Sequence, residues 1–310
     1  MGNMANHFRH VFHHYLLVTI GVLTFWVSHS APAQDLEPRS FTNIPTGMNF
    51  VAVGIVHSEG DFSPSPSIPA KNAMLTSNAA AFGYAHTFAL AGRSSKLDVT
   101  AARMCVDGRA EVNSERVEGS RCGYTDPQVR LTWNFYGAPA MSRAEFASYD
   151  QGVVIGTSLQ ISLPIGTYDE TKLLNAGANQ WIFRPSLGMS QHLGDWYYNL
   201  IASVRIYGDN DAYFNQTYVE QTPQYNVQAH LIYTLAPGQW VSLSGNYFYG
   251  SETRKNGGWS KDEQSNSRFG LTYSFAISRS QSIKLYASTG VITRIGNDFD
   301  TLGAMWQYAF

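Results

Sequence analysis

Eight polar side chains that can bind or carry charge stand in segments where apolar and polar residues alternate. They are Lys96, Asp98, Arg130, Arg184, Arg205, His230, Arg268 and Lys284. Six are Lys or Arg and one is acidic. On one shared face, this set would attract anions and bind carboxylate groups. The competing interpretation is a set of internal salt bridges, in which carboxylates from elsewhere in the chain are the partners.

Catalytic chemistry has little support in the sequence. The motifs G-x-S-x-G and H-E-x-x-H, a phosphate-binding loop and metal-spaced Cys/His sets are absent. His230 alternates with Asn226 and Gln228 and has no evident paired base, so we interpret it as an interior side chain that is hydrogen-bonded to its neighbours. We therefore expect no enzymatic activity, no cofactor and no metal.

The elements that carry these residues are strands, because hydrophobicity follows a period of two along most of the chain. Leu131, Trp133 and Phe135, for example, alternate with Arg130 and Thr132. Each segment is near the length of about nine to eleven residues that a tilted membrane strand needs. The twelve predicted strands are residues 49–59, 79–90, 96–105, 128–136, 152–163, 181–190, 196–207, 224–235, 240–250, 267–275, 282–292 and 302–310.

The connections between these strands alternate in length. The long ones are residues 60–78, 106–126, 164–180, 208–223 and 251–266, and the short ones are 91–95, 191–195, 236–239 and 276–281. Residues 137–151 break the rule, and residues 142–149 within them begin with a helix-capping signal. Long outer loops and short periplasmic turns are typical of bacterial barrels. We predict an all-β fold, a transmembrane antiparallel up-and-down barrel of about twelve strands over residues 34–310.

Residues 1–33 are predicted to be a cleavable signal peptide. Arg9 and His10 lie in a mildly basic start, residues 15–27 form an uncharged run, and Ala31-Pro32-Ala33 is a small-residue cleavage site. The alternative is a membrane anchor, but this run is shorter than the roughly 20 residues that a membrane-spanning helix needs. The mature chain should begin at Gln34.

The two cysteines, Cys105 and Cys122, bracket one predicted loop. Export places them where disulfides persist. We predict a disulfide between them, the alternative being two free thiols.

Composition favours a membrane barrel over a water-soluble β-sandwich. Charged residues and aromatic residues each make up 14% of the chain, and the mean hydropathy is −0.20. The formal net charge is −2, so the chain lacks the excess of positive charge that indicates nucleic-acid binding. Trp181, Trp196 and Trp240 flank strands, as aromatic residues do in the girdles of membrane barrels, whereas a sandwich would bury its apolar faces in a core.

The last predicted strand ends in alternating aromatic residues. Trp306, Tyr308 and Phe310 stand at steps of two, after Leu302 and Ala304. Such an ending resembles the signal that is read by the bacterial barrel-assembly machinery. We expect this machinery and outer-membrane lipid to be partners of the chain.

Several blocks of the sequence together resemble one known family. The blocks are Gly123-Tyr124-Thr125-Asp126-Pro127, Gly137-Ala138-Pro139-Ala140 and residues 163–188, 224–233 and 290–308. They resemble the MetA-pathway of phenol degradation family of outer-membrane proteins, over most of the mature chain. Thr125 departs from the pattern, where a second glycine is expected. The resemblance implies a barrel that transports aromatic or similarly hydrophobic compounds.

These observations lead us to expect a passive outer-membrane channel for small organic solutes in a Gram-negative bacterium. Downhill diffusion needs only a path and a weakly binding wall, and so needs no cofactor. The alternatives are a closed barrel with a structural or surface-binding role and, third, a barrel enzyme. Conductance in a planar bilayer separates the channel from the other two.

A narrower hypothesis concerns the predicted loop of residues 164–180, which carries Asp169 and Glu170. A long outer loop can fold into the mouth of a barrel, where shielded charges need partners. We expect one of these carboxylates to pair with Arg184 or Arg205 and so to set the width and charge of a constriction. The salt-bridge interpretation is favoured overall, because the interior of a small barrel is filled by side chains.

Overall fold

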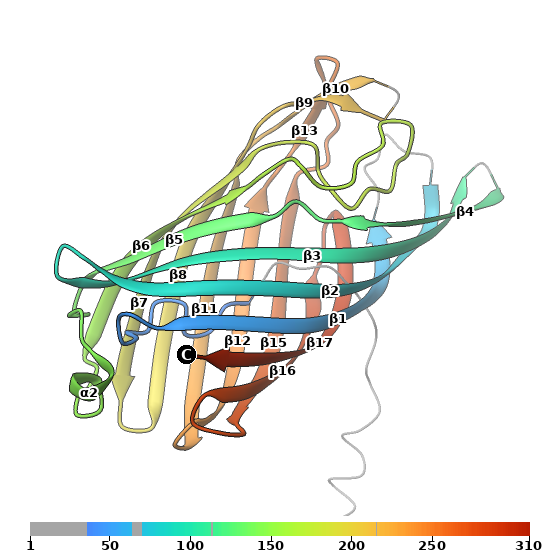
Figure 1. Ribbon diagram of the computed structural model, residues 1–310. Helices are drawn as coiled ribbons and strands as arrows, with labels where there is room; N and C mark the ends of the chain where they lie inside the picture. Colours follow the sequence, from blue (N-terminus) through green and yellow to red (C-terminus); the bar gives the residue numbers. More distant parts are fainter. Residues whose placement is uncertain (1–35, 64–69, 113, 215) are drawn as a thin grey trace, which may run out of the picture.

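The computed structural model describes residues 36–63, 70–112, 114–214 and 216–310, and the predicted signal peptide lies outside these ranges. Antiparallel strands close into one barrel, because β1 (Asn49–Ser63) pairs with both β2 (Ala70–Leu90) and the last strand, β17 (Gly296–Ala309) (Figure 1). Closure gives each of these strands a hydrogen-bonded neighbour on both sides, which a lipid environment requires.

The ring has twelve antiparallel strands, as predicted. One of the twelve positions is shared by two strands in line. β4 (Glu115–Tyr124) pairs with the end of β3 (Arg93–Val112), and β5 (Gln128–Tyr136) pairs with the beginning of β3. The remaining members of the ring are β6 (Val153–Ser162), β7 (Ile182–Leu193), β8 (Trp196–Tyr207), β11 (Gln224–Ala236), β12 (Gln239–Gly250), β15 (Gln264–Ala276) and β16 (Gln281–Ile292).

The two faces of the barrel wall reverse the arrangement of a water-soluble protein. Large apolar side chains are exposed on the outer face, among them Val53, Leu131, Leu159, Leu243 and Leu271. Small polar side chains are buried on the inner face, among them Ser58, Thr132, Ser158, Ser244 and Thr272. An apolar outer face and a polar interior are the properties of a transmembrane barrel.

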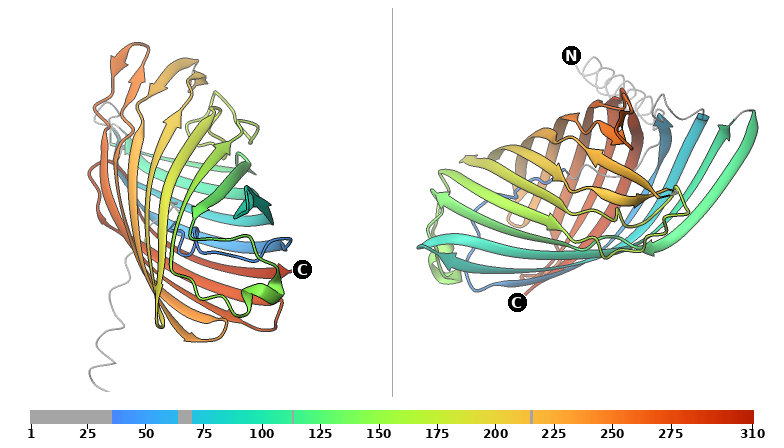
Figure 2. Two further views of the ribbon diagram at one scale, coloured as in Figure 1. Left: turned by 90° about the vertical axis from the view of Figure 1, so that its left-hand side faces the viewer. Right: turned by 90° about the horizontal axis from the view of Figure 1, so that it is seen from above.

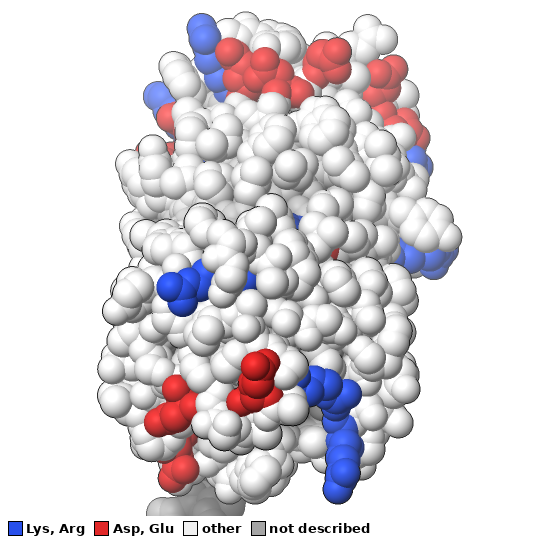
Figure 3. All heavy atoms as spheres, turned by 60° about the vertical axis from the view of Figure 1, so that its left-hand side comes forward, with Lys and Arg blue, Asp and Glu red and all other residues white. Residues whose placement is uncertain are grey.

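Two of the long loops contain short strands. They are β9 (Asn210–Tyr213), β10 (Thr217–Gln221), β13 (Thr253–Lys255) and β14 (Gly258–Trp259), which form a separate small sheet. Charged side chains gather at the two ends of the molecule, with acidic ones prominent at this end, and the wall between the ends is mostly uncharged (Figure 3). We call the end that carries the small sheet the outer end. The opposite, periplasmic end carries the tight turns and the C-terminus (Figure 1).

Strand boundaries agree with the sequence prediction where lipid covers one face. β5 and β8 begin and end at the predicted residues. The predicted loop of residues 106–126 is instead largely strand, because β3 and β4 continue outward as a paired hairpin. One face of this hairpin carries charged residues such as Arg109 and Glu118, and the other is made mainly of small residues such as Gly108 and Gly119, so no large apolar side chains mark these strands in the sequence although the backbone pairing continues. Cys105 and Cys122 are register partners in it and form the predicted disulfide.

The exceptional periplasmic connection contains the expected helical turn, α2 (Arg143–Phe146). Ser142 caps it: the Ser142 hydroxyl accepts from the Glu145 backbone NH, and the Glu145 carboxylate accepts from the Ser142 NH. Among the described residues, no helix is both long enough and apolar enough to cross a membrane.

Phe310 lies at the seam of the barrel, where the first strand, β1, pairs with the last, β17. Asn49 and Phe310 exchange two backbone hydrogen bonds of 2.9 Å each, the last pair of the β1–β17 ladder. Deleting Phe310 should therefore lower the amount of folded barrel in the membrane severalfold and leave export intact, as measured by the heat-modifiable band in membrane fractions. Phe310→Tyr, which keeps the ring and the backbone, is the control. Undiminished folded barrel after the deletion would contradict the prediction.

Candidate functional site in the barrel lumen

The lumen is occupied by residues 36–48, the N-terminal segment, which directly precede β1. This blue trace runs inside the ring of strands (Figure 2). Its backbone is held by the wall: the NH of Glu37 donates to Oε1 of Gln228 at 3.4 Å, and the NH of Arg39 donates to Oδ1 of Asn199 at 2.8 Å. The segment is thus hydrogen-bonded to β11 and β8 without being part of the sheet.

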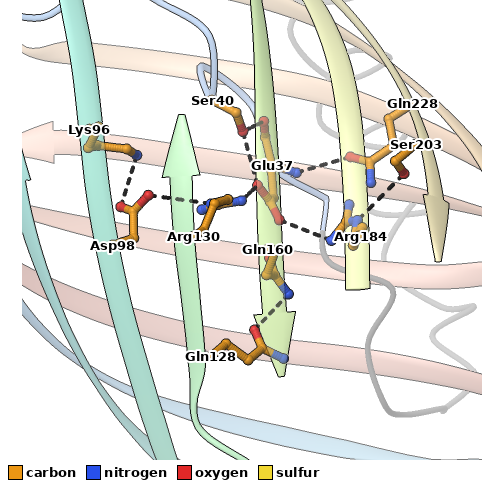
Figure 4. A network of polar contacts seen from close by, with 10 residues as sticks. All are labelled: Glu37, Ser40, Lys96, Asp98, Gln128, Arg130, Gln160, Arg184, Ser203 and Gln228. Carbon is orange, nitrogen blue, oxygen red and sulfur yellow. Dashed lines mark hydrogen bonds and ion pairs between the residues drawn. The ribbon is translucent and has the colours of Figure 1, made fainter. Parts of the chain in front are cut away.

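A carboxylate of the N-terminal segment lies between two arginines of the wall (Figure 4). Oε2 of Glu37 forms an ion pair with Arg130, and Oε1 lies 3.4 Å from Nη1 of Arg184. Asp98 extends the network, with Oδ2 3.4 Å from Nε of Arg130 and Oδ1 3.1 Å from Nζ of Lys96. These five side chains are only 9% to 23% exposed, so each charge depends on its partners.

Glu37 is ionised in this position. Burial by itself would raise the pKa of its carboxyl group, but the positive charges of Arg130 and Arg184 and the hydrogen bond from Arg130 hold the pKa at about 2. The ionic contacts of Glu37 are therefore present at neutral pH and are lost only as the pH falls towards 2.

Phe41 fills a recess where the wall carries glycines. Its side chain is 3% exposed and packs against Gly156 of β6 and Gly188 of β7, which are register partners. A Cβ atom built on Gly156 would lie 2.7 Å from Cδ1 of Phe41, and one built on Gly188 would overlap the ring. The absence of side chains at these two wall positions is what makes room for the ring.

Arg39 fixes the turn between Glu37 and Phe41. Its guanidinium carbon lies 4.4 Å from the ring centre of Tyr197 and 5.5 Å from that of Trp240. Arg39 has a φ of 68°, and the Ser40 NH donates to the Glu37 carbonyl, as in a turn with proline at its second position. The left-handed conformation costs a non-glycine residue about 1–2 kcal/mol, which these contacts offset.

The end of the N-terminal segment docks on the long periplasmic connection, residues 137–151. The NH of Asn43 donates to Oε1 of Gln151 at 2.9 Å, and the NH of Thr46 donates to the carbonyl of Met141 at 2.8 Å. This connection breaks the rule of short periplasmic turns, and its contacts with the segment explain the extra length.

The hypothesis that Asp169 or Glu170 pairs with Arg184 or Arg205 was wrong. Asp169 instead forms an ion pair of 3.1 Å with Arg121 of β4. Arg184 pairs with Glu37, and Arg205 donates to Oε1 of Gln224 at 3.4 Å. Asp169 also accepts from the NH and hydroxyl of Thr171, so its carboxylate is held within its own loop and at the outer hairpin.

Asp126 anchors the same outer loop. Its Oδ1 accepts from the NH of Gly166 at 2.8 Å, and its Oδ2 accepts from the NH of Ala178 at 2.7 Å. A Cβ atom built on Gly166 would lie 2.7 Å from Oδ1 of Asp126. Two blocks of the family resemblance, residues 123–127 and 163–188, therefore meet here and fix the loop over the outer end.

The other predicted lumen residues face inward but stand apart from the Glu37 network. Nδ1 of His230 lies 2.8 Å from the hydroxyl of Ser244, and Arg268 hydrogen-bonds to Ser288 at 3.1 Å. Lys284 lies within electrostatic range of Lys96, Glu37 and Arg130. Within the described part of the chain, Lys284 forms no close ion pair.

Comparison with known proteins identifies the family. The family model described as "Putative MetA-pathway of phenol degradation" matches residues 58–306, most of the chain. The chain belongs to this family. Among the curated proteins, none matches the sequence.

Solved structures similar to this member of the MetA-pathway family are outer-membrane barrels. An outer membrane channel from Pseudomonas putida F1 has a TM-score of 0.75 and 19% identity, covering 89% of this chain and 100% of that one. The β-domain of the Bordetella autotransporter BrkA has a TM-score of 0.53 and 12% identity, covering 85% of this chain and 100% of that one. The transport unit of the Escherichia coli autotransporter AIDA-I has a TM-score of 0.52 and 11% identity, covering 90% of this chain and 93% of that one. At these identities the likeness is one of fold.

In this MetA-pathway family member, Phe41 should hold the N-terminal segment against the wall. Phe41→Ala removes a buried ring, a change that costs about 3–5 kcal/mol in a packed core. Hydrogen exchange of residues 36–48 should become faster while exchange of β6 and β7 stays unchanged. Phe269→Ala, on the lipid-facing side, is the control. Equal exchange of the segment in wild type and Phe41→Ala would show that the ring does not hold it.

Proposed function

We propose that the protein is a passive channel of the Gram-negative outer membrane for small organic solutes, in which the N-terminal segment restricts the lumen. The observation that carries the proposal is how the lumen is filled. A barrel that served only as a scaffold could be filled by the side chains of its own wall. Here the filling is a separate segment held by hydrogen bonds, ion pairs and one ring, and such contacts are reversible.

The inner wall supports this proposal. Hydroxyl and amide side chains line it, among them Ser158, Gln160, Ser203, Gln228 and Ser244. A wall of weak hydrogen-bonding groups lets a solute enter without binding so tightly that it cannot leave. The family description refers to phenol degradation, which supports aromatic compounds as the solute class.

A barrel enzyme is the less favoured alternative. His230 and Ser244 lie at hydrogen-bond distance, as a nucleophile and its base would. Their side chains are only 3% and 1% exposed, and Nε2 of His230 has no hydrogen-bond partner among the described residues. A catalytic base needs a group that orients it and room for a substrate. The contact is better explained as a bond between neighbouring strands, β11 and β12.

Conductance distinguishes a channel from a closed structural or surface-binding barrel. Deleting residues 36–46 should raise single-channel conductance in planar bilayers severalfold over the wild type, because it empties the lumen and leaves the wall intact. Asp169→Asn, which changes a charge in the outer loop, should leave conductance unchanged. A deletion variant that folds as a barrel and shows neither conductance nor solute flux would refute the channel proposal and favour the closed barrel.

A further inference from the structure

The Glu37 carboxylate and the Phe41 ring meet the wall at one place. Together with Arg130, Arg184 and Ile201 they line a cavity of about 10 Å³, which is close to the space for one water molecule. Little space is therefore left between these two side chains and the wall at this place. A carboxylate and a phenyl ring that line the same small cavity are the two groups of an aryl carboxylic acid.

We propose that Arg130 and Arg184 form a binding site for small aryl carboxylates such as benzoate, which Glu37 and Phe41 occupy as an internal substitute until a solute displaces them. This inference rests on the proposed channel function and deepens it. It names the class of solute, and it names the event that clears the lumen: exchange of one carboxylate for another.

The two arginines stand at positions fixed by the sheet, and each also contacts a wall side chain: Nε of Arg130 lies 3.4 Å from Oδ2 of Asp98, and Nε of Arg184 lies 3.5 Å from Oγ of Ser203. Gln160 of β6 is the register partner of Arg130 on one side and of Arg184 on the other, so the arginines flank one strand. Each takes a different oxygen of the Glu37 carboxylate. Such a pair stays in place when the segment leaves, and a preorganised site binds a ligand with less loss of entropy.

The charge of the wall requires an anion at this site. Among the described residues of the network, Lys96, Arg130 and Arg184 are left with Asp98 as their carboxylate once Glu37 has gone, so three cations less one carboxylate give a net charge of +2. Shielded charges of one sign are unfavourable without a partner. A solute carboxylate satisfies the two guanidinium groups in the way Glu37 does, whereas a neutral aromatic alcohol does not.

The recess at Gly156 and Gly188 supplies the aromatic half of the site. Both glycines lie four residues from the network, at Gln160 and Arg184 of the same strands, and therefore on the same inner face. The recess belongs to the wall, so it remains available to another flat ring when Phe41 withdraws.

The contacts that hold the N-terminal segment are reversible, and part of their energy offsets one unfavourable backbone conformation. Arg39 holds a left-handed φ of 68°, a conformation that L-residues other than glycine avoid. Displacement releases this strain and exposes backbone groups that water can hydrogen-bond.

Benzoate binding to the purified full-length mature protein in detergent tests the inference, with benzyl alcohol as the uncharged probe. By calorimetry, Glu37→Gln/Phe41→Ala should bind benzoate with a Kd about tenfold lower than the wild type, because removing the internal competitor raises the fraction of binding-competent chains. Benzyl alcohol should show no such gain, and adding Arg184→Gln should abolish it. The matched control, Glu220→Gln/Phe269→Ala, removes a carboxylate paired with Arg254 in the outer loops and a lipid-facing ring.

Equal benzoate affinity in the double variant and the wild type, or equal gains for both probes, would overturn the inference. Should the double variant fail to fold, benzoate must still accelerate hydrogen exchange of residues 36–48 in the wild type where benzyl alcohol does not, and unchanged exchange would overturn it equally. The two proposals fail differently. Conductance without carboxylate binding removes only this inference, whereas benzoate binding without any flux leaves the site and removes the channel.

Discussion

The need of shielded basic side chains for a carboxylate organises the interior of this barrel. Lys96, Arg130 and Arg184 cannot face lipid, where a basic side chain at the midplane costs about 2–4 kcal/mol. Directed inward and largely shielded, they require anionic partners. Asp98 provides one from the wall, and Glu37 provides the other from the N-terminal segment. The position of residues 36–48 in the lumen follows from this requirement.

Other features of the fold accommodate the same segment. Glycines at positions 156 and 188 leave a recess for Phe41, and Gly270 leaves space for Leu36. The long periplasmic connection, residues 137–151, accepts its end through Gln151. The outer loop has a separate role, because it is tied to Asp126 and to the outer hairpin. The N-terminal segment and the outer loop are thus held by separate sets of contacts.

The sequence predicts the strands of the barrel wall better than it predicts the segment inside the lumen, for a physical reason. Lipid on one face and polar groups on the other impose a period of two, so the bounds of β5 and β8 could be predicted. In the outer hairpin of β3 and β4, small residues such as Gly108 and Ala110 alternate with charged ones, so the large apolar residues that mark a lipid-facing strand are missing. Residues 36–48 show no period of two, and Glu37 lies 147 positions from Arg184, its partner in the lumen. Six basic residues against one acidic residue indicated a missing carboxylate, but sequence alone could not distinguish Glu37 from Asp169 or Glu170.

The most direct test of this account is whether the N-terminal segment lies in the lumen in native membranes. A Cβ atom built on Gly188 lies 2.6 Å from Cγ of Phe41, so cysteines at these two positions would bring their sulfur atoms within bonding reach. The native cysteines are already paired and do not interfere. The account predicts that Phe41→Cys/Gly188→Cys forms a disulfide spontaneously, read as a mobility shift, whereas Phe41→Cys with the lipid-facing Gly245→Cys does not. Free, alkylatable thiols at both positions 41 and 188 in the folded barrel would contradict it.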